Sequence, residues 1–139
     1  NANLVDLNRN FPNKWGYLGT EGDWQYAGTR PASEPETRAI VALGDSVRPD
    51  LILWYHQDLF RISPSSGRDG DARARYAEIT GLPLIGITGG TYTGTASQWS
   101  RTVTTDVGIG FTVELGPTLT ETDITNHAAA VLAVAQELF

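Results

Sequence analysis

The 139-residue sequence contains no cysteine and no methionine. Without cysteine the chain has neither a disulfide framework nor a thiolate metal site, and cysteine usage favours no redox compartment. Without methionine the chain, which starts at Asn1, has no initiator residue. We therefore expect a processed chain or a fragment of a longer protein.

Basic residues and long apolar runs are scarce as well. Lys14 is the only lysine and the formal net charge is -6, so the sequence lacks the clustered positive charge that neutralises nucleic-acid phosphates. The longest apolar periodic segment, residues 128–138, is far below the roughly 20 residues of a membrane-spanning helix. The scarcity of positive charge favours small or peptidic partners over a nucleic acid. The lack of a long apolar run predicts no membrane span.

The apolar residues that are present, 40% of the chain, suffice for a single domain, residues 1–139, with its own core. Helices are expected after an N-cap at Ser33 and at residues 71–79, and a third is expected from a cap near 122–123 to Leu138. Apolar runs of strand length predict four strands, at residues 4–7, 51–55, 82–87 and 109–114. This pattern predicts an α/β fold, a mixed β-sheet flanked by helices on both faces.

Residues 5–12, Val-Asp-Leu-Asn-Arg-Asn-Phe-Pro, place several polar side chains in a segment that begins like a buried strand. Asp6, Asn8 and Arg9 fit poorly on a buried strand unless each finds a partner. A guanidinium beside a carboxamide can hold a carboxylate from two directions, a geometry that favours arginine over lysine. A salt bridge at a strand end would explain a lone arginine, but the motif as a whole favours a carboxylate-binding site.

Two later segments each end in a residue suited to catalysis. Residues 51–55 are a continuous apolar run typical of a central strand, and His56 follows at its carboxyl end, where ligands gather in α/β sheets. A lone histidine is more often structural, but this position makes His56 a candidate metal ligand. Glu114 ends the apolar run 109–114, where a carboxylate is costly unless it is paired or catalytic. Glu114 is therefore a candidate general base.

These three segments, in this order, resemble motifs of the zinc metallocarboxypeptidase family. The resemblance implies that Asn8 and Arg9 bind the terminal carboxylate of the substrate, and that Asp6 supports a zinc-bound histidine. It also implies that His56 is the third zinc ligand and Glu114 the catalytic base. The likeness extends over nearly all of the chain, which would be the C-terminal part of a carboxypeptidase-like catalytic domain.

Three other stretches bear on this resemblance. Residues 33–37, Ser-Glu-Pro-Glu-Thr, look like the start of the family's next helix, above all in the bacterial branch that acts on cell-wall peptides. Residues 88–100 are predicted to be a flexible run; in the family a mobile loop carries a tyrosine that closes over the substrate, a role implied here for Tyr92. Residues 13–31 are expected to be an ordered loop, whose aromatic residues either line a substrate cleft or cover the edge of the core.

The family's other zinc ligands have no counterpart in this sequence. In the family two of the three ligands come from a His-x-x-Glu motif before the Asn-Arg pair, and no such motif occurs here. The second histidine, His127, lies on the predicted last helix and is expected to be structural. Because one histidine holds zinc weakly, we expect zinc in the complete enzyme, and absent or weakly held in this chain. We also expect the chain to be inactive alone and to associate with the missing N-terminal segment or a second copy.

The resemblance predicts a zinc-dependent peptidase that hydrolyses a peptide bond next to a free C-terminal carboxylate. A γ-glutamyl-diamino acid bond of a cell-wall (murein) peptide is a second possible substrate. Residues 91–105 contain no acidic side chain that would select a basic substrate end, which favours a neutral or diamino-acid end. A secreted or cell-envelope location is expected over the cytoplasm. The alternative function is a non-catalytic module that binds carboxylates or peptides without a metal.

Overall fold

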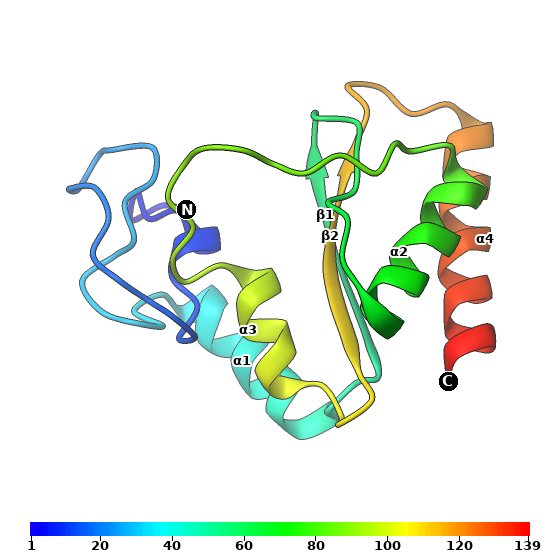
Figure 1. Ribbon diagram of the computed structural model, residues 1–139. Helices are drawn as coiled ribbons and strands as arrows, with labels where there is room; N and C mark the ends of the chain where they lie inside the picture. Colours follow the sequence, from blue (N-terminus) through cyan, green and yellow to red (C-terminus); the bar gives the residue numbers. More distant parts are fainter. The chain divides into compact units, whose positions relative to one another are not determined.

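The computed structural model describes residues 1–139, and the chain divides into two compact units (Figure 1). The first unit consists of residues 1–50 and 90–108. The second consists of residues 51–89 and 109–139. Each unit therefore combines two segments that are far apart in the sequence.

The first unit is helical. It contains a short 3-10 helix, η1 (Leu7–Arg9), and two α-helices, α1 (Pro35–Val47) and α3 (Ala96–Val103). Helix α1 packs on α3, as Figure 1 shows, and the contact is close because one residue of α1 is a glycine. A Cβ on Gly44 would lie 2.6 Å from the ring of Trp99, so only glycine allows this approach.

The strand expected at residues 4–7 is wrong. The side chain of Asp6 accepts a hydrogen bond from the backbone nitrogen of Asn8 at 2.9 Å and so caps η1. Leu4 has a φ of 57°, outside the β region. A short polar side chain that bonds to the nearby backbone favours a cap over a strand. The polar residues of this motif, and not its apolar ones, therefore determine that the segment forms η1 instead of a strand.

The expected N-cap of α1 is shifted by one residue. Glu34 takes the capping position, without a side-chain cap bond, and Pro35 begins the helix with a φ suited to its first turn. The Ser33 hydroxyl instead accepts a hydrogen bond from Asn10 and donates one to the Glu34 carboxylate at 2.7 Å. Helix α1 ends before Arg48, which adopts the left-handed conformation.

The flexible run expected at residues 88–100 is wrong from Ala96 onward, because α3 starts there. The Thr95 hydroxyl accepts a backbone hydrogen bond and caps the helix. Trp99 and Val103 are buried on its inner face. The serine and threonine content of this segment is typical of a loop, but capping and the burial of two apolar side chains make it helical.

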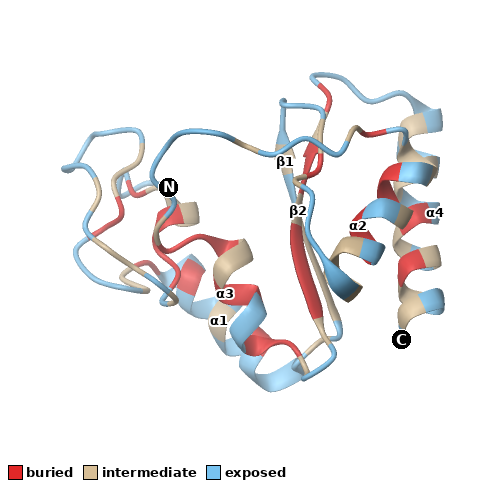
Figure 2. Cartoon of the chain, viewed as in Figure 1, coloured by how far each residue is buried: buried red, intermediate tan, exposed pale blue.

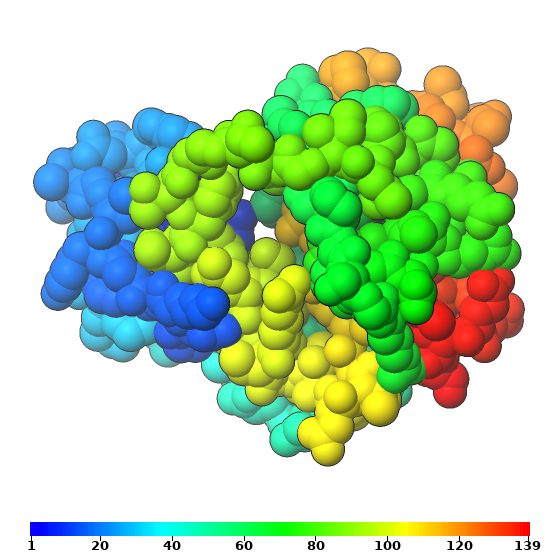
Figure 3. Space-filling view, in the orientation of Figure 1, coloured from blue at the N-terminus to red at the C-terminus, as the bar shows by residue number.

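The second unit consists of two parallel strands and two helices. Strands β1 (Leu51–Gln57) and β2 (Ile109–Leu115) were both predicted, and they pair in parallel along their whole length. Helices α2 (Gly67–Thr80) and α4 (Glu121–Leu138) pack on each other, and Figure 3 shows the green surface of α2 directly against the red surface of α4. Both helices were expected, and both start earlier than predicted.

The core of the second unit lies between this sheet and these helices. Every second residue of β2 is buried in it, and Figure 2 shows β2 buried along most of its length. Side chains of α2 and α4 complete the cluster, whose central members are Ile62, Ala72, Tyr76, Ile109, Phe111, Val113, Ala130 and Val134. The residues between them on β2 must then face away from α2 and α4.

The α/β class is confirmed, although the sheet is smaller than expected. The strand predicted at residues 82–87 is reduced to a single parallel bridge between Leu84 and Ile62. An antiparallel bridge joins Arg61 to Glu114. The pairing is therefore mixed, but only two segments qualify as strands.

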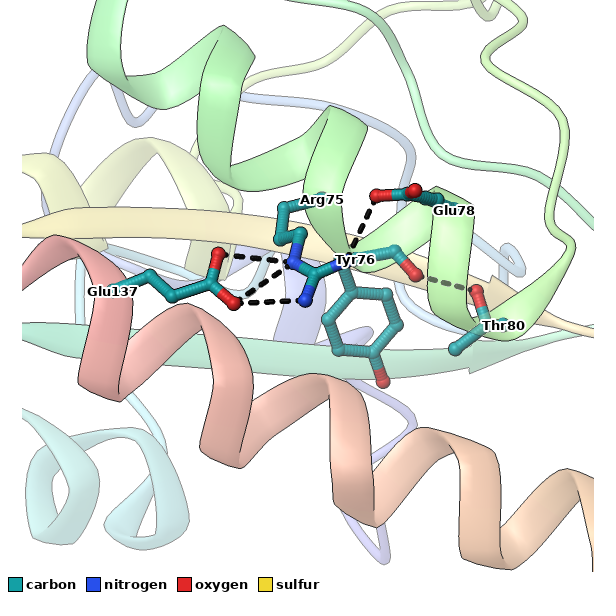
Figure 4. A network of polar contacts seen from close by, with 5 residues as sticks. All are labelled: Arg75, Tyr76, Glu78, Thr80 and Glu137. Atoms are coloured by element: carbon teal, nitrogen blue, oxygen red, sulfur yellow. Dashed lines mark hydrogen bonds and ion pairs between the residues drawn. The ribbon is translucent and has the colours of Figure 1, made fainter.

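An ion-pair network on the surface joins the two helices of the second unit. Arg75 of α2 donates hydrogen bonds to Glu137 of α4 at 2.8 to 3.0 Å and to Glu78 at 2.8 Å, as drawn in Figure 4. These carboxylates raise the pKa of Arg75 above its ordinary value, so the arginine stays charged. None of the helices combines the length and the apolar character needed to cross a membrane.

Candidate carboxylate-binding and catalytic residues

Arg9, at the end of η1 in the first unit, is buried and keeps an unpaired donor. The residue is 6% exposed, and its Nη1 donates to the Asn8 carbonyl at 2.7 Å. Its Nε is buried with no hydrogen-bond partner. The Asp6 carboxylate is 3.9 Å from Nη1, at the outer limit of an ion pair. A planar guanidinium with a free donor fits a carboxylate ligand, because an unmade buried hydrogen bond is costly.

Tyr92 lies over this arginine, held by contacts that the sequence did not reveal. The Arg9 guanidinium carbon is 5.4 Å from the centre of the Tyr92 ring, a cation–π distance. Gln98 of α3 donates from Nε2 to the Tyr92 carbonyl at 3.0 Å. Gly94 has a φ of 58°, and a Cβ there would lie 2.4 Å from the Arg9 carbonyl oxygen. The backbone at Gly94 therefore lies directly against that of Arg9. In the sequence, only the glycine at this position indicates so close an approach.

Asn8 and Asp6 act on the local backbone. The Asn8 side-chain oxygen accepts a hydrogen bond from the Ala96 nitrogen at 2.9 Å, which satisfies a free donor at the start of α3. This bond fixes the carboxamide and leaves its amino group to donate elsewhere. Asp6 caps η1 and faces Arg9, as described above. The structure thus brings together Asp6, Asn8, Arg9 and Tyr92 within the first unit.

His56 and Glu114 lie together in the second unit. They are register partners at the carboxyl ends of β1 and β2, and His56 Nδ1 is 3.4 Å from Glu114 Oε1. The Glu114 side chain is 9% exposed and that of His56 is 33% exposed. A buried carboxylate beside an imidazole can accept a proton from water, and the imidazole nitrogen can bind a metal.

His127 is separate from this pair and has a structural environment, as expected. Its Nδ1 is 2.8 Å from the hydroxyl of Tyr76, which is itself 3.0 Å from the hydroxyl of Tyr55. Burial lowers the pKa of His127 and raises that of Tyr76, so both stay uncharged at neutral pH. This chain of contacts joins β1, α2 and α4.

Known proteins resemble this chain in sequence and in fold. Residues 1–59, which contain the arginine motif and His56, match the zinc carboxypeptidase family. Murein peptide amidase A of Escherichia coli (strain K12) is 34% identical over 111 residues, which cover 71% of this chain and 45% of the amidase. The crystal structure of the murein-tripeptide amidase from Escherichia coli O157 matches 99% of this chain and 60% of its own, with a TM-score of 0.69 and 28% identity. The chain belongs to the zinc carboxypeptidase family.

The fold extends to more distant members of the family. Carboxypeptidase A from Helicoverpa armigera matches 95% of this chain and 41% of its own with a TM-score of 0.78, at 17% identity. This chain spans about half the length of the curated murein peptide amidases that it matches, 45% and 57% of two of them. The strand with Glu114 lies beyond the matched residues 1–59 but within the span of the structural matches.

The residues of this zinc carboxypeptidase-family chain do not form a complete zinc site. No group of three or more His, Cys, Asp or Glu side chains is placed to hold a metal ion. A catalytic zinc keeps three protein ligands, and here only His56 stands beside the proposed base, since His127 contacts Tyr76. Within the chain, His56 is therefore a single candidate ligand.

Proposed function

We propose that this chain is part of a zinc-dependent peptidase and binds the free C-terminal carboxylate of the substrate next to the bond that is cleaved. The observation that carries the proposal is the buried Arg9 guanidinium, with an unpaired Nε and the Tyr92 ring above it. The amino group of Asn8 is the second donor to the carboxylate. Asp6 keeps η1, and with it Arg9, in place.

Glu114 is the proposed general base of the same reaction. Its buried carboxylate would take a proton from the attacking water and pass it to the leaving amine. Zinc belongs to the complete enzyme in this proposal, with His56 as one ligand and the others outside this chain. The chain alone would then be inactive, and a further segment of the protein or a second copy would be needed to complete the site.

The proposed substrate is a cell-wall peptide cleaved at a γ-glutamyl-diamino acid bond. Relatives named as murein peptide amidases support this substrate; one of them is 34% identical over 71% of the chain. Such a substrate also ends in a free carboxylate for Arg9. A secreted or cell-envelope location, where murein is found, belongs to the same proposal.

A substitution of Arg9 tests the proposed binding of the substrate carboxylate. In the full-length protein, Arg9→Lys keeps the charge but loses the planar fork, so KM for a peptide with a free C-terminus should rise about tenfold or more, the worth of a hydrogen bond to a charged group. KM for the same peptide as a C-terminal amide should change little. Steady-state kinetics on both peptides measure this, with Arg38→Lys as the control.

Arg38 suits the control because it is an exposed arginine of the first unit that donates only to the carbonyls of Ala32 and Ser33. Unchanged discrimination between acid and amide in Arg9→Lys would contradict the proposal. Tight binding of the acid peptide by the full-length protein without any hydrolysis would instead indicate the non-catalytic binding module.

A further inference from the structure

Arg61 lies directly beside Glu114 and has no part in the proposed reaction. Its backbone nitrogen donates to the Glu114 carbonyl at 3.0 Å, and the Glu114 nitrogen donates to the Arg61 carbonyl at 3.0 Å. Residues that exchange both hydrogen bonds across an antiparallel pair have Cα atoms about 5.5 Å apart, and their side chains emerge on the same face. The Arg61 side chain therefore rises beside that of Glu114.

The next residue confirms this direction. Ile62 is fully buried in the core under α2 and α4. Successive side chains of an extended segment point to opposite faces, so Arg61 points away from that core. His56 is the register partner of Glu114 on its other side and shares its face. His56, Glu114 and Arg61 thus form a row across the end of the sheet.

The guanidinium of Arg61 is uncommitted. Its Nε is buried with no hydrogen-bond partner, and it takes part in none of the ion pairs of the structure. Other arginines of the same unit are paired: Arg73 with Asp69, and Arg75 with Glu137. A buried donor without a partner is costly, and a guanidinium prefers a planar anion such as a carboxylate.

We propose that Arg61 binds a carboxylate on the substrate residue that supplies the scissile carbonyl, a proposal that rests on the peptidase function above. In a γ-glutamyl bond the scissile carbonyl belongs to the side chain, so the α-carboxylate of the same residue stays free a few bonds away. The charge of Glu114 would repel that carboxylate, and Arg61 offsets the repulsion. An ordinary peptide bond presents no such group. Arg61 is thus a specificity determinant for γ-linked acidic residues.

Two substrates that differ only in this group test the proposal. One is a peptide with a γ-D-glutamyl-diaminopimelate bond, and the other is the same peptide with the glutamyl α-carboxylate converted to a carboxamide. The full-length enzyme should show a kcat/KM about tenfold or more higher on the acid. Arg61→Gln should lower kcat/KM on the acid by the same factor and leave the amide within about twofold, because the amide never used the charge.

Arg75→Gln is the matched control, since it removes the same charge from an exposed arginine of the same unit. It should leave the ratio of acid to amide unchanged. Arg61→Lys keeps the positive charge but loses the planar guanidinium, so it should lower the ratio of kcat/KM on the acid to kcat/KM on the amide only partly. This variant replaces Arg61→Gln in the test if the glutamine variant fails to fold.

Different results would contradict the role of Arg61 and the proposed peptidase function. An equal loss on both substrates in Arg61→Gln would make the residue structural and overturn the proposal. Equal cleavage of acid and amide by the unmodified enzyme would also overturn it, while the peptidase function would stand. Cleavage of neither substrate would overturn the proposed function and this inference with it.

Discussion

Among single residues, the side chains proposed to bind the substrate carboxylate also hydrogen-bond to the backbone. Asn8 is the clearest case, because its oxygen accepts the Ala96 N–H at the start of α3 and its amino group is left to donate. Arg9 in the same way donates to the Asn8 carbonyl and keeps Nε free. One part of each side chain is structural and another part is available for a ligand.

Two substitutions of Asn8 separate these two tasks. Asn8→Asp keeps the acceptor for Ala96, so the free energy of unfolding should change by less than about 0.5 kcal/mol. It replaces a donor by a negative charge, so affinity for a peptide carboxylate should fall about tenfold or more. Asn8→Leu removes both groups and should also cost about 1–2 kcal/mol of stability. Calorimetry of peptide binding and thermal unfolding of the full-length protein measure the two effects.

If Asn8→Asp bound the peptide as tightly as the unmodified protein, the amino group would have no part in binding. If Asn8→Leu were as stable as Asn8→Asp, the hydrogen bond between Asn8 and the start of α3 would contribute nothing to the free energy of unfolding. Either outcome would contradict one of the two tasks and leave the other intact.

At the scale of elements, the start of α1 fixes the N-terminal segment of the first unit. The Glu34 carboxylate is buried and accepts hydrogen bonds from Ser33, Asn1 and Asn3 at 2.7 to 2.8 Å. These bonds, above all the one from Ser33, lower the pKa of Glu34. Asn10, which is fully buried, joins the same network and ties it to the arginine motif.

The lowered pKa of Glu34 sets the direction of a pH effect. A carboxyl whose pKa is lower in the folded than in the unfolded state stabilises the fold above its ordinary pKa, and this contribution is lost as the pH falls through the folded-state value. Glu34→Gln should therefore cost about 1–3 kcal/mol at pH 7. The difference from the unmodified protein should shrink below the ordinary pKa of glutamate. Denaturant unfolding at a series of pH values measures it.

Glu36→Gln is the control for this prediction, because Glu36 is an exposed glutamate on the first turn of the same helix. Its effect should be smaller at every pH. A Glu34→Gln penalty that stayed constant from pH 7 to strongly acidic solution would show that the charge of Glu34 contributes nothing.

The elements also show what the sequence could predict. Strands β1 and β2 and helix α4 were predicted because each is a sustained apolar pattern with end signals. Helix α3 was missed because it has only eight residues and lies in a segment rich in serine and threonine, although its buried residues keep helical spacing; its stability comes from the cap at Thr95 and from burial of Trp99. The strand at residues 4–7 was wrongly predicted because the Asp6 side chain bonds to the nearby backbone.

At the scale of the whole molecule, the predicted chemistry divides between the two units. The residues proposed to bind the carboxylate all lie in the first, and His56, Glu114 and Arg61 all lie in the second. The motifs could be recognised from sequence because each is short and local. The contacts of Gln98 with Tyr92 and the row at Arg61 could not, because they depend on which segments pair in space.

Apolar surface on α1 fits the expectation of an associated segment or copy. Several apolar residues of this helix are exposed, among them Leu43 at 58% and Val47 at 60%. Monomeric proteins seldom leave a contiguous apolar face uncovered. Nothing within the first unit covers these two residues.

Glu114 is the proposed base of a peptidase whose substrate carboxylate is held by Arg9, and a single substitution at Glu114 tests this role. Glu114→Gln keeps the size and hydrogen bonding of the side chain but removes the basic oxygen. In the full-length enzyme, kcat on a murein peptide should fall at least about a hundredfold, while the affinity for the uncleaved peptide stays unchanged. A kcat within a few fold of the unmodified enzyme would show that Glu114 is structural and is not the base.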